Sequence, residues 1–353
     1  MLTSGVFGYL FDYLLWWVLL ASLFVHAWCF LRFFPRKKYR KAGLILGNAL
    51  AFGCMLGVVA IIGESYFRFV YVSTDAFGMS LPARRWFALH TTLNSLGCRD
   101  KEWSIEKPTG VRRIAFVGDS FAYGWGLKRV EDRFTERVAA RFADRASGAV
   151  EVMNVAKPGW GTEDQMAPVA DLVTRFGVDE IVLCYVPNDI EKRLPRNNEF
   201  DPIRPPESRF IDPDRSCLLD YLYRRICVPR VASVRDYHDW LTDGLEDPET
   251  WGAHTGDLSA IARFCRDHRV RFRVALLPFI RTSGEKYVAS AVHGKLTKFL
   301  RGIDVEVADL LPALADHDPA NLTVNSQDAH PNEQAHELFA GAIWKRFYSE
   351  DGP

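Results

Sequence analysis

The sequence predicts a three-layer α/β/α sandwich with a parallel sheet, preceded by an N-terminal hairpin of two transmembrane helices. Two long uncharged segments near the N-terminus indicate the hairpin, and apolar strands alternating with helical segments from residue 111 onward indicate the sheet. The 353 residues suffice for a domain with its own core plus further elements. We therefore divide the chain into a hairpin at 1–63, a connecting arm at 64–110 and a globular domain at 111–353.

The two N-terminal segments are long and apolar enough to cross a membrane as helices. Residues 13–31 and 42–63 carry no formal charge, and about 20 apolar residues cover the hydrocarbon layer. A cleaved signal peptide is the alternative for the first segment. However, its lead-in has no basic residue, carries Asp12 and is followed by no A-x-A site.

A basic segment joins the two spans and predicts their orientation. Its six basic side chains, without an acidic one between them, are Arg32, Arg36, Lys37, Lys38, Arg40 and Lys41. Because Lys and Arg are enriched on the cytoplasmic side of membranes, we expect this short loop to lie inside the cell. Everything after Glu64 would then be extracytoplasmic, on the periplasmic side of the inner membrane in a Gram-negative bacterium.

The charge of the remaining chain argues against nucleic acid as a partner. Without these six residues and Asp12, the 44 basic and 44 acidic side chains of the chain become 38 and 43. The part after the hairpin is thus mildly acidic, whereas nucleic-acid-binding domains present basic surfaces.

Regular alternation of strands and helices begins at residue 111. The apolar strands expected are RRIAFVGDS, VEVMNVA, EIVLCYV, VRFRVALLP and VEVADL. The helices expected run over Glu131–Ala143, from near Thr162, around Leu258–Asp267, around Lys286–Arg301 and from Glu333.

The stretch 191–252 interrupts this alternation. It contains clusters of Pro, Asn and Arg beside the amphipathic run CLLDYLYRRI. A cap over the site, a membrane-facing surface and a tolerated surface excursion are the alternatives. Cys217 and Cys227 flank that run, and an oxidising compartment would allow a disulfide between them.

A serine follows the first strand directly, in Gly118-Asp119-Ser120-Phe121. A strand-to-helix turn exposes a hydroxyl and aims the amides at the helix start towards developing negative charge. The alternative is that Asp119 or Ser120 is an ordinary helix N-cap.

Three further loops carry polar or glycine-rich groups beyond strand ends, where open parallel sheets place their sites. Gly159 lies in NVAKPGWGT, where glycine would let a backbone N–H approach an oxyanion; a plain turn is the alternative. Asn188 lies in VPND and would supply an amide donor. His330 lies in DAHPN, and the proline after it favours a loop.

These four blocks, in this order, resemble those of the SGNH hydrolase (GDSL-type esterase/lipase) family over roughly residues 111–350. The resemblance implies a flavodoxin-like SGNH hydrolase fold for the catalytic domain at 111–353, with the insert at 191–252. The upstream segment NSLGCR, which ends at Arg99, resembles a lead-in of membrane-anchored relatives. We interpret Arg99 as structural rather than as a substrate contact.

The resemblance also implies the role of each residue. Ser120 would be the nucleophile, His330 its general base and Asp328 the acid that orients the imidazole. The oxyanion hole would comprise the backbone N–H groups of Ser120 and Gly159 and the side chain of Asn188. Asp119 would have a supporting role.

Two positions depart from the commonest pattern of the family. The spacing D-x-x-H would place the acid at position 327, which is Gln327, so the acid stands one step closer, at Asp328. This D-x-H spacing resembles that of branches acting in polysaccharide acetylation. Val186 replaces a glycine two positions before Asn188, and Pro187 stiffens the turn.

Topology and resemblance together imply an extracytoplasmic serine esterase acting on an O-acetyl or short-acyl ester of an envelope carbohydrate or lipid. The alternatives are an O-acyltransferase acting on a polysaccharide with the same catalytic set, and a non-catalytic subunit of a glycan-modifying membrane complex. The intact catalytic set argues against the last. No zinc-type cysteine spacing or cofactor motif occurs, so we expect neither a metal nor an organic cofactor.

Overall fold

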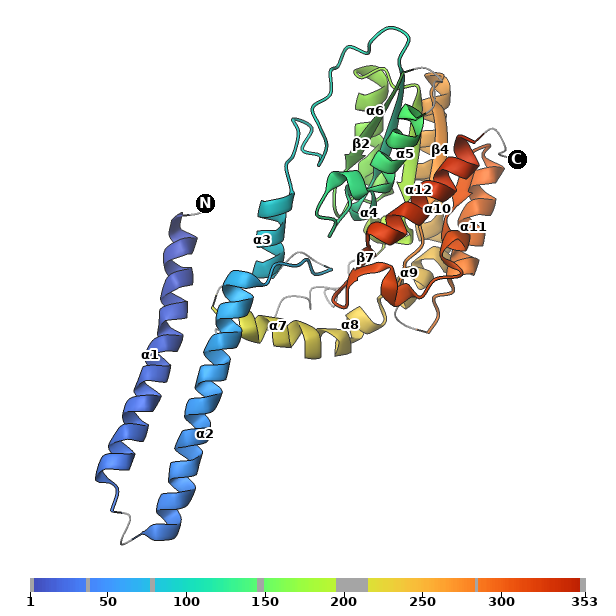
Figure 1. Ribbon diagram of the computed structural model, residues 1–353. Helices are drawn as coiled ribbons and strands as arrows, with labels where there is room; N and C mark the ends of the chain where they lie inside the picture. Colours follow the sequence, from blue (N-terminus) through green and yellow to red (C-terminus); the bar gives the residue numbers. More distant parts are fainter. Residues whose placement is uncertain are drawn as a thin grey trace. The chain divides into compact units, whose positions relative to one another are not determined.

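The computed structural model describes residues 3–35, 39–76, 80–144, 149–194, 215–282 and 285–349. The chain divides into two compact units (Figure 1). The first comprises Met1–Phe87 and Asp201–Arg230, and the second comprises Ala88–Phe200 and Val231–Pro353.

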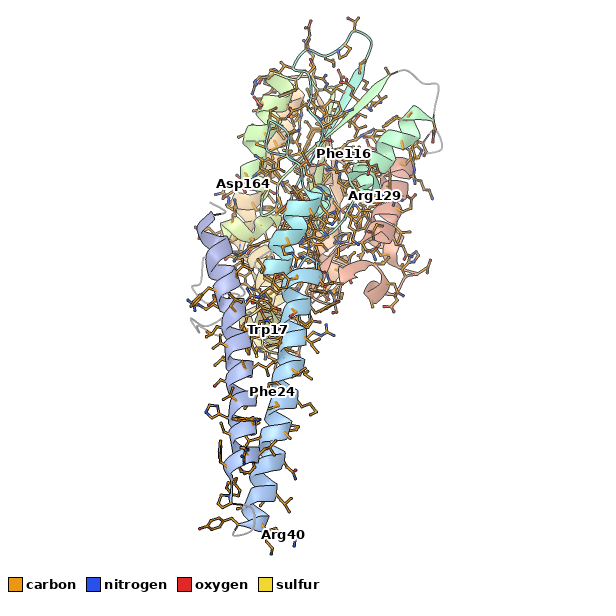
Figure 2. All side chains as sticks on the ribbon, turned by 60° about the vertical axis from the view of Figure 1, so that its left-hand side comes forward. Trp17, Phe24, Arg40, Phe116, Arg129 and Asp164 are labelled. Atoms are coloured by element: carbon orange, nitrogen blue, oxygen red, sulfur yellow. The ribbon has the colours of Figure 1, made fainter. Side chains whose placement is uncertain are left out.

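Two antiparallel helices, α1 (Thr3–Phe33) and α2 (Arg40–Ser65), dominate the first unit. They cover the two predicted spans, and both are long and apolar enough to cross a membrane. Glycines on α2 face leucines of α1: a Cβ at Gly57 would come within 2.7 Å of Leu20 Cδ1. Large apolar side chains such as Trp17 and Phe24 project outward from α1 (Figure 2). Positions 36–38 of the basic segment lie outside the described residues.

Short elements complete the first unit: a π-helical turn (Tyr66–Val70), most of α3 (Leu81–His90), α7 (Cys217–Ile226) and a 3-10 turn (Val228–Arg230). Helix α3 lies in the segment 64–110, where the sequence has no sustained apolar period. Cys217 and Cys227 are free thiols, so the disulfide considered above is absent. Ten helical positions separate their backbones by about 15 Å, beyond the reach of a disulfide.

A five-stranded parallel sheet with the order β2-β1-β3-β4-β5 forms the centre of the second unit, as predicted. Its strands are β1 (Arg112–Gly118), β2 (Val150–Ala156), β3 (Glu180–Tyr185), β4 (Arg271–Leu276) and β5 (Glu306–Asp309).

Helices cover both faces of this sheet (Figure 1). On β1, Ala115 and Val117 point into the main core, whereas Phe116 points to the other face, where it meets Phe134. Because both faces are covered, the strands are apolar at successive positions. One face carries α5 (Phe134–Ala143) and α12 (Glu333–Phe347), and the other carries α6 (Thr162–Thr174), α9 (Tyr237–Glu246), α10 (Pro248–Asp267) and α11 (Ala289–Gly302).

Three helices begin at other residues than the periodicity indicated, among them α11, which starts at Ala289 and not near Lys286. Helix α10 starts at Pro248, ten positions before Leu258, because the Asp247 carboxylate caps its first turn by accepting from the Thr250 N–H. Helix α5 starts at Phe134, because the preceding Val130–Asp132 forms a separate 3-10 turn.

The strand register places three loops side by side at the carboxyl ends of the strands. Gly118, at the end of β1, pairs with Ala156 of β2 and with Cys184 of β3. The loops that follow these residues contain Ser120, Gly159 and Asn188. Strand β1 lies at the point where the strand order reverses, which is where open α/β sheets form their sites.

Candidate active site

Ser120 occupies the first turn of the short helix α4 (Ser120–Tyr123), directly beyond β1. Asp119 caps this helix: its Oδ1 accepts from the Phe121 N–H at 2.9 Å. The tight turn requires glycine at 118, because a Cβ there would lie 2.8 Å from Cys184 Cβ and 2.9 Å from that of Ala122. The local sequence therefore fixes the Ser120 hydroxyl just beyond the carboxyl end of β1.

Ser120, His330 and Asp328 form a continuous chain of hydrogen bonds. His330 Nε2 lies 2.9 Å from Ser120 Oγ, and His330 Nδ1 lies 2.6 Å from Asp328 Oδ1. An ionised carboxylate only accepts, so Nδ1 carries the proton and the lone pair of Nε2 faces the serine hydroxyl. Asp328 is fully buried, and His330 is largely buried. The arrangement is that of a nucleophile, a base and an acid that orients the base.

A β-hairpin presents the histidine and the aspartate. It comprises β6 (Thr323–Asn325) and β7 (Asp328–Pro331). Arg281 donates to the carbonyl oxygens of Asn325 at 2.8 Å and Ser326 at 3.3 Å, which holds the hairpin turn. Asn332 then caps α12 through the N–H groups of its first turn. Arg281 cannot be identified from sequence, because its contacts are to backbone atoms 44 and 45 positions away.

Two aromatic rings enclose the imidazole. Trp125 stacks on His330 with the ring centroids 5.2 Å apart and the planes 25° apart, and the Phe121 ring centroid lies 5.4 Å from that of His330. These rings restrict the orientation of the imidazole and exclude water from its faces. Trp125 was also missed from sequence, where its signal is an aromatic residue between two glycines near the candidate nucleophile.

Arg99 holds the loop that carries Trp125. Its buried guanidinium donates to the carbonyl oxygens of Gly124 at 2.8 Å, Leu127 at 2.7 Å and Lys128 at 3.3 Å. Burial lowers the pKa of Arg99 to about 10, so it remains charged at neutral pH. These contacts agree with the structural interpretation of Arg99.

Asn188 and Gly159 lie in the loops that follow β3 and β2, next to the loop that carries Ser120. Asn188 lies in the 3-10 helix Pro187–Arg193 after β3, and its Nδ2 donates to Asp119 Oδ2 at 3.4 Å. Gly159 has a φ of 77°, a left-handed conformation that favours glycine. Its turn lies against the β1 loop, because the Lys157 N–H donates to the Gly118 carbonyl oxygen at 3.2 Å.

Two carboxyl groups, those of Asp119 and Asp189, are buried in the loops that follow β1 and β3. Burial raises the pKa of Asp119, although the Phe121 N–H opposes this shift. Burial raises the pKa of Asp189 well above its usual range, and the neighbouring Asp119 raises it further. Gln165 Nε2 lies 3.4 Å from Asp189 Oδ2. Burial of Asp189 thus disfavours its ionised form.

A cavity of the second unit lies elsewhere. It measures about 430 Å³ and is lined by residues such as Arg271 and Glu306 at the start of β4 and β5. Ser120 lies beyond the carboxyl end of β1, whereas the cavity lies at the amino ends of parallel strands of the same sheet. The cavity therefore does not belong to the site. No group of three or more His, Cys, Asp or Glu side chains in the described part of the chain is arranged to hold a metal ion.

Comparison with known proteins places the chain in a family. The sequence profile of the GDSL-like lipase/acylhydrolase family matches residues 116–338, more than half of the chain. No curated protein matches the sequence significantly.

Similar solved structures include three bacterial or metagenomic proteins. An acetylxylan esterase from Geobacillus stearothermophilus is 13% identical, with a TM-score of 0.43 over 69% of this chain and 96% of that one. A lipolytic G-D-S-L protein from Veillonella parvula is 15% identical, with a TM-score of 0.39 over 67% and 98%. An α/β hydrolase from the metagenome of Lake Arreo is 15% identical, with a TM-score of 0.43 over 68% and 95%.

The family match begins within β1, before Ser120, and extends beyond His330, so it includes every residue predicted for the catalytic set and the oxyanion hole. The chain therefore belongs to the GDSL-like lipase/acylhydrolase family and is an ester hydrolase of the SGNH class.

Proposed function

We propose that this ester hydrolase is membrane-anchored, acts outside the cytoplasm and removes an O-acetyl or short-acyl group from an envelope carbohydrate or lipid. The reaction would proceed through an acyl-serine intermediate on Ser120. The observation that carries the catalytic part of the proposal is the continuous hydrogen-bond chain from Ser120 through His330 to Asp328.

In the acylation step, Ser120 Oγ attacks the ester carbonyl carbon while His330 Nε2 takes the hydroxyl proton. The carbonyl π electrons move to its oxygen, which the N–H groups of Ser120 and Gly159 and the Asn188 amide would stabilise. When the tetrahedral intermediate collapses, the ester C–O bond breaks and His330 gives the proton to the departing alcohol oxygen. Asp328 stabilises the imidazolium throughout.

In the deacylation step, water takes the place of the alcohol. His330 removes a proton from the water as the water oxygen attacks the acyl carbon, and a second tetrahedral oxyanion occupies the same donors. Collapse breaks the bond to Ser120 Oγ, and His330 returns the proton to that oxygen. The products are a carboxylic acid and the free enzyme.

The anchoring part of the proposal is supported by the exposed apolar surface of α1 and α2. Side chains such as Ile45 and Val25 stay exposed within the chain, which is unfavourable in water and favourable in lipid. The basic segment between these helices argues for a cytoplasmic loop, and hence for an extracytoplasmic hydrolase domain. The substrate class is inferred from this topology and from the family.

Labelling with a fluorophosphonate probe tests the catalytic proposal. The full chain should be labelled, Ser120→Ala should not be, and Ser290→Ala, which removes an exposed serine on α11, should be labelled like the parent. Absence of labelling in folded parent protein would refute an activated serine.

A comparison of products distinguishes hydrolysis from acyl transfer. Acetate release from acetylated oligosaccharides should exceed acetyl transfer to an added acceptor. If transfer dominates, the proposed activity is acyl transfer instead of hydrolysis.

A reporter fused after Pro353 tests the orientation. It should be active only outside the cytoplasm.

A further inference from the structure

Glu64 attaches helix α7 to the end of α2. Its buried carboxylate accepts hydrogen bonds, each at 3.0 Å, from the Ser216 hydroxyl and from the backbone N–H groups of Cys217 and Leu218. These amides belong to the start of α7, so the carboxylate caps that helix. Arg68 Nε donates to the same carboxylate at 2.7 Å, and this ion pair compensates the cost of burying the Glu64 charge. The attachment is therefore specific.

The attachment lies beside Asp12 near the start of α1 and Ser65 at the end of α2. Asp12 of α1 lies 3.4 Å from Arg215, the residue before the Ser216 contact, and the Tyr13 hydroxyl lies 2.8 Å from Ser65 Oγ of α2. If the helices span a membrane, this level is the boundary between hydrocarbon and headgroups. Helix α7 begins beside this end of α2 and runs across its axis (Figure 1).

The inner face of α7 is unusually polar. Asp220 and Arg224 are buried and paired, with Arg224 Nε 3.0 Å from Asp220 Oδ1 and Oδ2. On the same side, Tyr221 stacks on Phe67 of the π-helical turn at 4.1 Å. The two buried charges of this face thus neutralise each other within the helix.

The outer face of α7 is apolar. Leu219, Leu222, Tyr223 and Ile226 follow the i, i+3, i+4, i+7 spacing of one helix face. Leu222 is 40% exposed and Ile226 is 49% exposed. A helix on a water-soluble surface shows the reverse distribution, with apolar side chains inside and charges outside.

Exposed apolar and basic side chains also occur beside α7. Tyr66, Phe69 and Val70, in the π-helical turn against which α7 packs, are each more than 40% exposed. Arg225 and Arg230, in and after α7, are also exposed. An apolar helix face with basic side chains beside it is typical of helices that lie in the interface of a membrane with anionic lipids.

We propose that α7 lies in the extracytoplasmic lipid interface, with Leu219, Leu222, Tyr223 and Ile226 among the upper acyl chains and Arg225 and Arg230 at lipid phosphates. This proposal rests on the membrane anchoring proposed above. A lipid surface accounts for three features together: the attachment at the polar end of the spans, the direction of α7 across α2 and the basic residues. A protein partner would require only the apolar face.

Depth-dependent fluorescence quenching in nanodiscs tests the proposal with the full chain. Cys29 and Cys227, the free cysteines among the described residues that are not buried, are first replaced by serine. Single cysteines are then introduced as Leu222→Cys, Ile226→Cys, Ile45→Cys in α2 and Val288→Cys in the hydrolase domain, all at exposed positions. Each is labelled with a polarity-sensitive fluorophore, and the nanodiscs contain phosphatidylcholine and phosphatidylglycerol, with or without bromine near the glycerol end of the acyl chains.

We expect brominated lipid to quench most of the emission from positions 222, 226 and 45, and to leave position 288 unchanged. Position 288, in contrast, should be quenched by iodide in water. Equal thermal unfolding midpoints of the four variants will exclude misfolding as a cause.

If position 45 is quenched but 222 and 226 behave like 288, the anchoring stands and the interfacial helix is refuted. If 222 and 226 are protected from both iodide and brominated lipid, protein covers the face instead of lipid, which also overturns the proposal. If position 45 itself is not quenched, the membrane anchoring has failed, and with it this inference.

Discussion

Asp328 Oδ1 lies 2.6 Å from His330 Nδ1 and also accepts the backbone N–H of His330 at 3.1 Å, within a single four-residue strand. Alternate residues of a strand point to the same side. The spacing D-x-H therefore suits a strand, where it brings the carboxylate under the imidazole. Gln327, in the position of the commoner acid, precedes the strand, and its N–H donates to Asn325 Oδ1 in the hairpin turn.

Replacement of Asp328 tests this relationship. Asp328→Asn should leave KM nearly unchanged and lower kcat by about 10³ to 10⁴, because an amide no longer fixes the required tautomer or stabilises the imidazolium. Ester hydrolysis by the full chain measures both constants. Asp316→Asn, at an exposed position nearby, is the control and should keep full activity.

A second variant distinguishes the two spacings directly. In Gln327→Asp combined with Asp328→Asn, the carboxylate stands at the commoner D-x-x-H position, and activity should stay as low as in Asp328→Asn alone. Restoration of most of the activity would show that the position on the strand does not matter, contrary to our interpretation of β7.

The Asn188 amide provides a separate prediction for the oxyanion hole. Asn188→Ala should lower kcat by about 10² to 10³, which is the usual cost of one lost donor, with a much smaller effect on KM. Asn188→Asp should be at least as damaging, because it places an acceptor beside Asp119 and the developing oxyanion. A change in KM alone would indicate that Asn188 binds substrate without stabilising the transition state.

Much of the hydrolase domain could be predicted because its strands are buried on both faces. Such strands are short continuous apolar runs, as in β3, where each residue from Glu180 to Tyr185 is buried. The boundaries were less predictable: the start of α10 depends on the cap supplied by Asp247, and its first turns lack a clear apolar period. Helix α3 was missed because it combines Pro82, Arg84 and Arg85 with few apolar residues.

The candidate site could be predicted where chemistry dictates the residue type, as at Ser120 and His330. The supporting residues could not, because their contacts depend on folding. Arg99 reaches carbonyl groups 25 to 29 positions away, and Trp125 meets the ring of His330. Neither type of contact leaves a local pattern in the sequence.

Arg99 should contribute both stability and activity. Arg99→Met leaves three buried or partly buried carbonyl oxygens without their charged donor, and we expect a loss of about 2 to 4 kcal/mol in the free energy of unfolding. The turnover number should also fall, because the loop that places Trp125 on His330 loosens. Arg129→Met removes an exposed arginine from the same loop region and should change neither quantity. Urea unfolding and ester hydrolysis measure the two effects, and equal behaviour of both variants would contradict this role.

His336 should make the stability of the hydrolase domain depend on pH. Its ring is fully buried, stacks on Phe134 and accepts the Phe134 N–H through Nδ1 at 3.1 Å. Burial, with a smaller effect of Arg133, lowers the pKa of His336 to about 3, whereas a histidine in the unfolded chain titrates near 6.5. Between these values the unfolded chain binds a proton that the folded chain does not. The contribution of His336 to stability is therefore complete above about pH 6.5 and falls by about 1.4 kcal/mol per pH unit below it.

Comparison with His336→Asn isolates this contribution from that of other titrating groups. Asn offers an acceptor in place of Nδ1 but does not titrate, so any pH dependence common to both proteins cancels in the difference. Urea unfolding from about pH 7.5 to about pH 4.5 should show the stability of the parent declining relative to that of the variant as the pH falls. A difference that stays constant over this range would mean that His336 titrates alike in the folded and unfolded chains, which its burial beneath Phe134 argues against.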